Sequence, residues 1–259
     1  MSTVIYPSPI FGPVHSRRLG VSLGINLMPA DGKICTFDCI YCECGFNADH
    51  RPRLHRPTRE EVREKLEQQL VKMVGEGRLP DVLTFAGNGE PTAHPDFKAI
   101  IEDTIQLRNR HCPEARVGVL SNATLAAKPS VREALLMVDN NILKLDTVNA
   151  EYIRRVNAPT GHYDVGEVVE ALKSYHGHVI IQTMFMKGRD MHGVSVDNTG
   201  EEYVGPWIEA VKAIAPQSVM VYTIDRETPD QALLKATHEE LDAIVARVKA
   251  CGIPASASY

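Results

Sequence analysis

Apolar side chains recur along the chain with two periods, one of two residues and one of about 3.6 residues. Residues 19–28 place apolar side chains at every second position, which predicts a strand with one buried face. Residues 58–77 repeat apolar side chains at helical spacing, and Thr58 and Glu61 at their start have the spacing of a capping box. The chain therefore begins with a strand, a long loop and an amphipathic helix.

The order of strand and helix repeats through the rest of the chain. Short apolar runs predict strands, and each run is followed by a segment with helical spacing. Further strands are expected at 81–87, 116–121, 141–146, 178–184 and 217–224. Further helices are expected at about 96–109, 129–137, 164–175, 200–214 and 237–250.

This alternation predicts an α/β fold with mostly parallel strands, because the strands are apolar almost throughout, as strands covered on both faces are. Six strands are too few for a complete eight-stranded barrel, so we predict a partial (β/α)6 TIM-like barrel. The prediction is a single domain over 1–259, with an N-terminal extension at 1–18 and a C-terminal helix at 237–251. A doubly wound open sheet is the alternative; in both folds, ligands bind at the carboxyl ends of the strands.

Composition narrows the class of protein. The 259 residues, of which 44% are hydrophobic and 24% charged, are enough for a sizeable core. The net charge of −5 gives no general attraction for nucleic acid, although a local basic patch is compatible with it. No apolar run approaches the ~18 residues of a membrane helix, and the first residues lack a signal-peptide pattern, so we expect a cytoplasmic protein with no membrane partner.

Four of the six cysteines lie within ten residues, directly after the first predicted strand. In a chain of this size, such clustering favours metal binding or redox chemistry over disulfides. Cys35, Cys39 and Cys42 form a CxxxCxxC motif. Three thiolates on one compact loop can bind three corners of an iron–sulfur cube and leave the fourth iron open to a small chelating molecule.

The CxxxCxxC motif, with Tyr41 directly before its last cysteine, resembles the signature of the radical S-adenosylmethionine (SAM) superfamily. The resemblance implies that the three cysteines hold a [4Fe-4S] cluster and that the amino and carboxylate groups of SAM chelate the open iron, with Tyr41 near the cofactors. One electron would then cleave SAM to methionine and a 5′-deoxyadenosyl radical that abstracts hydrogen from a substrate. An electron donor such as flavodoxin or ferredoxin is also implied.

Two other functions use the same cysteines. A structural zinc site with Cys44 or His50 as fourth ligand would make the protein a binding module without catalysis. Zinc modules usually combine two CxxC pairs, however, and the cluster segment contains one. An iron–sulfur cluster that only carries electrons is the second alternative.

The second predicted strand is followed by Gly87, Asn88, Gly89, Glu90 and Pro91. Two glycines allow close approach of the backbone to a ligand, and a carboxylate can pair with a cation, although a β-turn with a solvated glutamate would look the same. The segment resembles the GGEP motif of radical SAM enzymes, with Asn88 as a departure. The resemblance implies that residues 87–90 bind the SAM amino group.

Polar residues also follow the next two strands. They are expected in the same cavity by the resemblance, which implies Ser121 and Asn122 near the SAM ribose or carboxylate and Asp146 facing them. They are equally common as helix caps and turn formers. Gln182 lies in an otherwise apolar strand, where an unpaired amide is costly, so a neighbour or a ligand must satisfy it; we favour a ligand.

Two longer segments, 13–29 and 221–229, resemble an incompletely characterised branch of the superfamily that is grouped with wyosine-type tRNA synthases and with the molybdenum-cofactor enzyme that rearranges GTP. They contain the candidate substrate residues. Guanidinium groups suit oxyanions, although the same residues also serve as solvated charges or rim ion pairs. The candidates are Arg17, Arg18, Tyr222 and Arg226.

The remaining cysteines limit the number of clusters. Wyosine synthases of archaeal type carry further cysteines upstream, and the GTP-rearranging enzyme carries a C-terminal triplet, but this chain has no cysteine before Cys35 and only Cys251 near its end. We therefore predict one cluster, with Cys44 left open as a spare thiol or alternative ligand and Cys112 as a bystander. The negative charge favours a small-molecule or peptide substrate over tRNA.

Overall fold

The structure is a computed structural model that describes residues 3–16 and 20–259. Its main sheet has the strand order β1-β2-β3-β4-β5-β6-β8-β10. The bounds are β1 Ile10–Ser16, β2 Gly20–Ile25, β3 Val82–Phe85, β4 Arg116–Ser121, β5 Asn140–Lys144, β6 Ile180–Met184, β8 Ser218–Tyr222 and β10 Ala255–Ser258. A small antiparallel sheet joins β7 (Met186–Gly188) and β9 (Leu233–Lys235).

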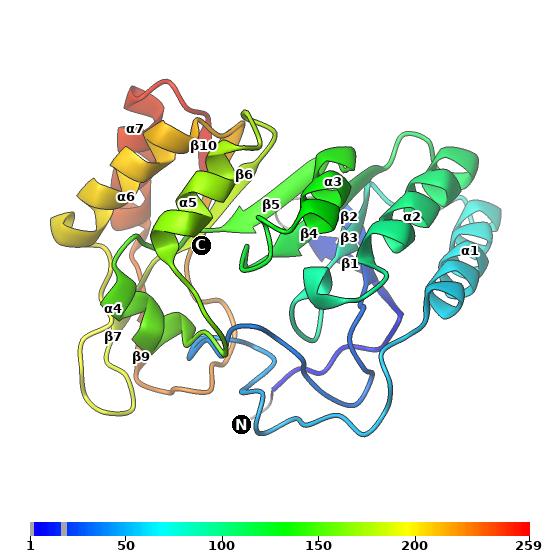
Figure 1. The fold of residues 1–259 in the computed structure, drawn as a ribbon, viewed down its shortest axis with the longest axis horizontal. Coiled ribbons are helices and arrows are strands. Elements are labelled where there is room, and N and C mark those ends of the chain that lie inside the picture. Colours follow the sequence, from blue (N-terminus) through cyan, green and yellow to red (C-terminus); the bar gives the residue numbers. More distant parts are fainter. Residues whose placement is uncertain (1–2, 17–19) are drawn as a thin grey trace.

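The strands from β2 to β10 are parallel, and they follow one another in chain order across the sheet. A doubly wound sheet reverses its strand order, so this order confirms the barrel-type architecture. Strands β1 and β10 form the two edges, which leaves the barrel partial. Successive right-handed crossovers place the helices on one side of such a sheet, and Figure 1 shows them in an arc from α1 to α7.

The helices agree with the predicted positions to within a few residues. Thr58 and Thr237 both form complete capping boxes at the starts of α1 and α7. The main helices are α1 Arg59–Gly75, α2 Phe97–His111, α3 Pro129–Met137, α5 Val165–Lys173, α6 Glu201–Ile214 and α7 His238–Ala250. Shorter turns are η1 Pro91–Ala93, α4 Ala150–Tyr152 and the π-helical turn η2 Ile153–Asn157.

The two edge strands, β1 and β10, were not predicted from the sequence, and each omission has a physical reason. Strand β1 contains Pro13, which cannot donate a ladder hydrogen bond and is tolerated only at an edge or bulge; the pairing with β2 shifts register between Phe11 and Val14. Strand β10 consists of alanine and serine, which give no apolar pattern, and it pairs with β8. The predicted extension at 1–18 thus includes a strand of the sheet.

The first predicted strand is shorter than expected and is buried on both faces. It ends at Ile25 because Asn26 turns the chain, with its side-chain oxygen accepting a hydrogen bond from Met28 N at 3.0 Å. Leu23 faces the helices, while Ser22 and Gly24 line a cavity inside the barrel. The alternation predicted one buried face, but both are buried, because Leu23 packs against the helices and the Phe11 ring lies against Gly24 on the inner side.

One apolar cluster joins the outward-facing residues of the strands to the helices. It includes Leu23, Leu66, Val117, Ile181 and Trp207, all of which are buried. The loops that follow the strands gather at the carboxyl ends of the strands, at the bottom of Figure 1. In the described part of the chain, no helix is both long and apolar enough to cross a membrane.

Candidate functional site

The cysteine segment follows β2 and crosses the carboxyl end of the sheet. Asn47 braces it, because its side chain accepts a hydrogen bond from Cys35 N at 3.1 Å and donates to the carbonyl oxygens of Cys35 and Phe37. The segment touches the loop after β3 through a bridge between Ile34 and Gly89. A Cβ atom at Gly89 would lie 1.8 Å from the oxygen of Ile34, so only glycine allows this approach.

A cavity of about 370 Å³ opens between the cysteine segment and the strand ends. It collects most of the residues that the sequence singled out, from five separate segments. Those on its wall are Cys35, Cys39, Tyr41, Cys42, Gly89, Glu90, Ser121, Asn122, Gln182, Tyr222 and Arg226. Gly87, Asn88 and Asp146 are absent from this wall. Arg17 and Arg18 lie outside the described residues.

The three cysteines of the motif are free thiols in different surroundings. Burial raises the pKa of Cys35 above its ordinary range, and it raises the pKa of Cys39 to about 11 although Lys144 partly offsets the effect. The pKa of Cys42 is lowered, because Cys44 donates a hydrogen bond to it and Lys33 lies nearby. Two side-chain amides also approach the sulfurs, Asn122 Nδ2 at 3.6 Å from Cys35 and Asn157 Nδ2 at 3.7 Å from Cys39.

Lys33 places a buried positive charge beneath this loop. Its ammonium group donates to Gly45 O at 2.6 Å and lies 3.3 Å from Asp38 Oδ1. Burial on its own lowers the pKa of Lys33, but the motif cysteines and Asp38 raise it overall. The negative charge that thiolates bring to this loop therefore has a compensating cation in place.

Cys44 does not join the other three thiols on the cavity wall. Its buried sulfur lies beside the Cys42 thiol and 3.5 Å from Gly87 O. Cys112 lies in the apolar core and Cys251 is exposed, as bystanders would.

Glu90 is buried and ties the loop after β3 to the end of β4. Its Oε1 accepts hydrogen bonds from Thr92 N, Thr92 Oγ1 and Ser121 Oγ, at 3.0, 2.6 and 2.8 Å. Its Oε2 accepts one from Asn122 N at 2.7 Å. Burial raises the pKa of Glu90 although these donors counteract it. Glu90, Ser121 and Asn122 thus form one fixed unit on the cavity wall, with acceptor capacity remaining at Oε2.

Asn88 holds the N-terminal segment. Its side-chain nitrogen donates to Tyr6 O and Pro29 O at 2.9 and 3.0 Å, and its side-chain oxygen accepts from Tyr6 N at 2.7 Å. The Asn88 amide is therefore fully used within the protein, and Asn88, which was expected to contribute its backbone to the cofactor site, does not line the cavity.

Asp146 lies behind the cavity wall, which corrects the expectation that it faces the cavity. Its Oδ2 accepts hydrogen bonds from Tyr41 OH and from Asn157 Nδ2, the latter at 2.8 Å. Its Oδ1 accepts from Met184 N at 2.9 Å and lies 3.4 Å from Lys144 Nζ. Asp146 therefore orients two residues that do face the cavity, Tyr41 and Lys144.

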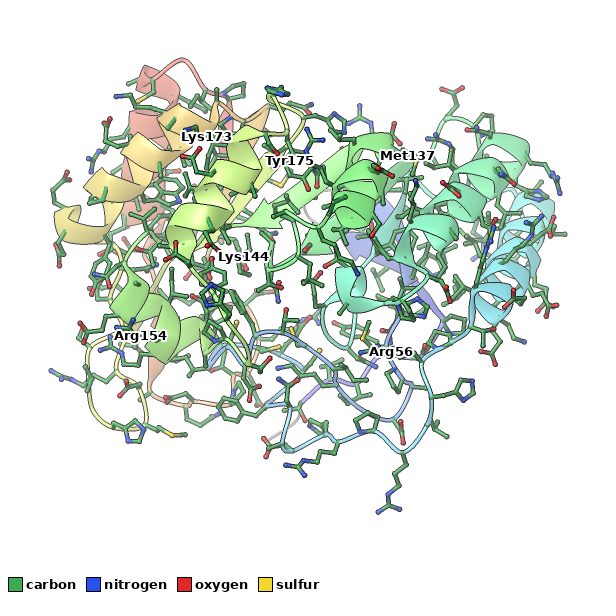
Figure 2. The ribbon with its side chains drawn as sticks, in the orientation of Figure 1. Arg56, Met137, Lys144, Arg154, Lys173 and Tyr175 are labelled. Atoms are coloured by element: carbon green, nitrogen blue, oxygen red, sulfur yellow. The ribbon has the colours of Figure 1, made fainter. Side chains whose placement is uncertain are left out.

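Lys144, labelled in Figure 2, is the last residue of β5 and reaches into the cavity. Its ammonium donates to Tyr222 OH at 2.8 Å and lies 5.2 Å from the centre of the Tyr41 ring. Burial on its own lowers the pKa of Lys144, but Asp146, Tyr222 and Cys39 raise it overall, so the group stays protonated. The cavity thus contains a fixed positive charge beside Cys39.

Arg226 lies at the rim of the cavity, where it is already paired. It donates to Glu43 Oε2 at 2.6 Å and to Tyr6 OH, and the same tyrosine hydroxyl donates to Glu43 Oε1 at 2.9 Å. This agrees with the rim ion pair considered for it, although with Glu43 as the partner. The contact joins the N-terminal segment, the cysteine segment and the loop after β8.

Three contributors to the site were missing from the predicted site residues. Lys144 had a signal, because a lysine that ends a buried parallel strand points to a site. Asn47 and Asn157 had none, since both lie in irregular backbone; Asn157 belongs to the π-helical turn, a feature common at functional sites.

Comparison with known proteins agrees with this geometry. The model of the radical SAM superfamily matches residues 31–197, more than half of the chain. A Brachyspira hyodysenteriae protein named GTPase Obg is 29% identical over 238 residues, which cover 90% of this chain and 32% of that protein. The UPF0026 protein of Methanocaldococcus jannaschii is 31% identical over 198 residues, which cover 74% of this chain and 58% of the relative. The chain thus spans well under two thirds of each of these relatives.

Solved structures share the fold at low sequence identity. A radical SAM methyltransferase from Sphaerobacter thermophilus has a TM-score of 0.66 at 15% identity, over 92% of this chain and 66% of that one. Streptococcus suis SuiB bound to S-adenosylmethionine has a TM-score of 0.65 at 14% identity, over 91% of this chain and 50% of that one. Archaeal TYW1 has a TM-score of 0.54 at 13% identity, over 88% and 71%. With a family model that matches most of its length, the chain belongs to the radical SAM superfamily.

Proposed function

We propose that the protein is a radical SAM enzyme in which Cys35, Cys39 and Cys42 hold one [4Fe-4S] cluster. The observation that carries the proposal is that these three free thiols border one cavity together with the fixed unit of Glu90, Ser121 and Asn122. Three cysteines fit a cluster that keeps one iron open to a chelating ligand, and Cys44 does not line the cavity.

The protein groups around the sulfurs suit such a cluster. Amide donors from Asn122 and Asn157 approach two of the three sulfurs, and Lys33 supplies a buried positive charge. Hydrogen bonds to sulfur and nearby charge stabilise the reduced form of an iron–sulfur cluster and raise its reduction potential. When bound, the cluster supplies the single electron that cleaves SAM reductively to methionine and a carbon-centred radical.

The cofactor SAM carries an amino group, a carboxylate and a sulfonium, and the cavity offers a partner for each kind of charge. Glu90 Oε2 and the backbone of Gly89 lie on the cavity wall and can accept from the amino group. Lys144 offers a positive charge for the carboxylate. Tyr41 and Tyr222 on the cavity wall limit the access of water to the reacting centre. A radical reaction requires this exclusion of water.

A small molecule or a peptide is the proposed substrate, with a one-electron donor such as flavodoxin or ferredoxin as partner. The net charge of −5 argues against a large polyanion. Among the similar structures, Streptococcus suis SuiB is bound to its precursor peptide SuiA, with a TM-score of 0.64 over 91% of this chain.

Anaerobic reconstitution tests the proposed function. The protein should take up about four iron atoms and four sulfides per chain, and it should release 5′-deoxyadenosine when SAM and dithionite are added. A colourless protein that binds one zinc and no iron would make it a zinc-stabilised module. An intact reduced cluster that forms no 5′-deoxyadenosine would leave it an electron carrier.

A further inference from the structure

A second cavity, which we call the lumen cavity, lies inside the partial barrel and adjoins the first. Its volume is about 150 Å³. It shares Glu43, Leu120 and Gln182 with the wall of the 370 Å³ cavity between the cysteine segment and the strand ends, which we call the upper cavity. Side chains that alternate toward the inside of the strands form its wall. They include Ser22 and Gly24 of β2, Thr84 of β3, Leu120 of β4, Ile142 of β5, Gln182 of β6 and Met220 of β8.

The N-terminal segment closes the lumen cavity with aromatic rings. Phe11 and Tyr6 lie with their ring centres 4.7 Å apart on its wall. A Cβ atom at Gly24 would lie 2.2 Å from the Phe11 ring, so the absence of a side chain there lets the ring enter the barrel. Strand β1 thus supplies an aromatic face opposite Leu120, Ile142 and Met220, which suits a flat or aliphatic apolar group.

Nearly every polar group on this wall is already paired within the protein. Ser22 Oγ and Thr84 Oγ1 hydrogen-bond to each other at 2.8 Å. Glu43 is paired with Arg226 at 2.6 Å and accepts from Tyr6 OH at 2.9 Å. These pairs leave the lumen cavity without an available charge for a charged ligand.

Gln182 is the exception. Its side chain is only 8% exposed and borders both cavities, and its amide makes no hydrogen bond with any residue in 3–16 or 20–259. Because Gln182 lines both cavities, its amide keeps donor and acceptor capacity that a ligand in either cavity can use. In register, Gln182 lies between Lys144 of β5 and Met220 of β8, at the boundary between the charged and the apolar cavity.

We propose that the lumen cavity binds an uncharged, mainly apolar group of the substrate, and that Gln182 orients this group through its amide. A charged group would lose its hydration without gaining an opposite charge, whereas an apolar group with one amide or carbonyl satisfies Gln182 and fills the rest of the space. The assignment rests on the proposed function in one respect, namely that the group held below the cofactor cavity belongs to the substrate.

Equilibrium dialysis with benzamide and benzoate tests the assignment. The two probes have the same shape, but benzamide is uncharged and benzoate is an anion. The experiment uses the full chain reconstituted with iron and sulfide, in the presence of SAM. Benzamide should bind saturably, and benzoate should displace it only at concentrations about tenfold higher or more.

Variants locate the bound probe. Ile142→Phe fills the lumen cavity and should weaken benzamide binding by about tenfold or more, while the volume-matched control Ile142→Leu should bind like wild type. Gln182→Leu removes the amide and should weaken benzamide binding by about tenfold, because one hydrogen bond is lost. Far-ultraviolet circular dichroism and iron content establish that each variant is folded and loaded.

The assignment is overturned if benzamide does not bind saturably, if benzoate displaces it at equal concentration, or if Ile142→Phe leaves its affinity unchanged. Because the readout is binding, the two proposals fail separately. A protein that forms 5′-deoxyadenosine from SAM but binds no benzamide rejects only the lumen assignment. A protein that binds benzamide as described but takes up no iron rejects only the proposed function.

Discussion

The two walls of the upper cavity differ in how completely the protein pairs their polar groups. On the wall formed after β3 and β4, Glu90 accepts four hydrogen bonds from Thr92, Ser121 and Asn122. On the wall formed by β5, β6 and β8, the Gln182 amide makes no hydrogen bond within the described residues, and Lys144 contacts Asp146, Tyr222 and the Tyr41 ring. The first wall is therefore preorganised, as a site for a cofactor that does not vary should be. The second wall keeps hydrogen-bonding capacity that a further ligand can use.

The largest expected effect comes from the thiols of the cysteine segment, which borders the cavity after β2. Cys39→Ala removes a cluster ligand and should abolish iron and sulfide uptake, whereas Cys44→Ala should retain both because Cys44 does not line the cavity. Iron and sulfide analysis after anaerobic reconstitution measures the difference. A colourless Cys44→Ala protein would show that the ligand set is wrong.

Breaking the fixed unit should cost cofactor affinity. Glu90→Gln places an amide nitrogen among donors from Thr92, Ser121 and Asn122, so SAM binding should weaken by about tenfold or more while the iron content is kept. The matched control is Glu227→Gln, which changes an exposed glutamate that borders the same cavity in the loop after β8. Equal SAM affinity in the two variants, measured by equilibrium dialysis, would contradict the role given to Glu90.

Lys144 tests the second wall. Lys144→Met removes the protonated amine beside Cys39 and should weaken SAM binding by about tenfold, with unchanged iron content. Lys187→Met breaks an ion pair with Glu240 that lies away from the cavity and should bind SAM like wild type. If Lys144→Met instead loses iron, the residue serves cluster assembly and the contrast between the two walls is wrong.

The smallest effect is expected in the helical layer behind the first wall, and it depends on pH. Asp103 is buried, and the guanidinium of Arg59 at 2.7 Å, with Arg63 nearby, holds its pKa below the ordinary value. A lowered pKa gives stability that is present above the unfolded-state pKa of about 4 and is lost as the pH falls through the folded-state pKa. Asp103→Asn should therefore lower the free energy of unfolding by about 1–2 kcal/mol at neutral pH, and less as the pH falls toward about 3.

Urea unfolding from acid to neutral pH measures this effect, with Glu133→Gln as control because its ion pair with Lys98 is exposed. Asp103→Asn should keep wild-type SAM affinity. A loss of stability that grows toward acid pH would contradict the sign derived from the lowered pKa, and a loss of SAM binding would show that the first wall depends on the outer layer.

Sequence reasoning recovered the parallel strands because each is a short apolar run between helical segments. It also placed Cys35, Glu90, Ser121 and Gln182 in one region, since parallel strands direct their carboxyl ends to the same edge. It failed where tertiary contacts decide. Pro13 concealed β1, which a bulge at the sheet edge accommodates, and the Ala and Ser of β10 carry no pattern.

The errors within the site share one physical cause. A polar residue after a strand can face the cavity or the protein, and the partner that decides the matter is distant in the chain. The Asn88 side chain is hydrogen-bonded to Tyr6, 82 positions away, and the Asp146 side chain is hydrogen-bonded to Tyr41, 105 positions away. Asn157 lies close to Cys39 because it belongs to a π-helical turn, and no local sequence pattern predicts that turn.

The electron paramagnetic resonance spectrum of the dithionite-reduced protein, recorded with and without SAM, tests the central claim most directly. A cluster held by Cys35, Cys39 and Cys42 alone keeps one iron open, so addition of SAM should change the g-values of wild-type protein and of the Cys44→Ala variant alike. A spectrum that SAM leaves unchanged, in a protein shown to contain a reduced cluster, would contradict the account.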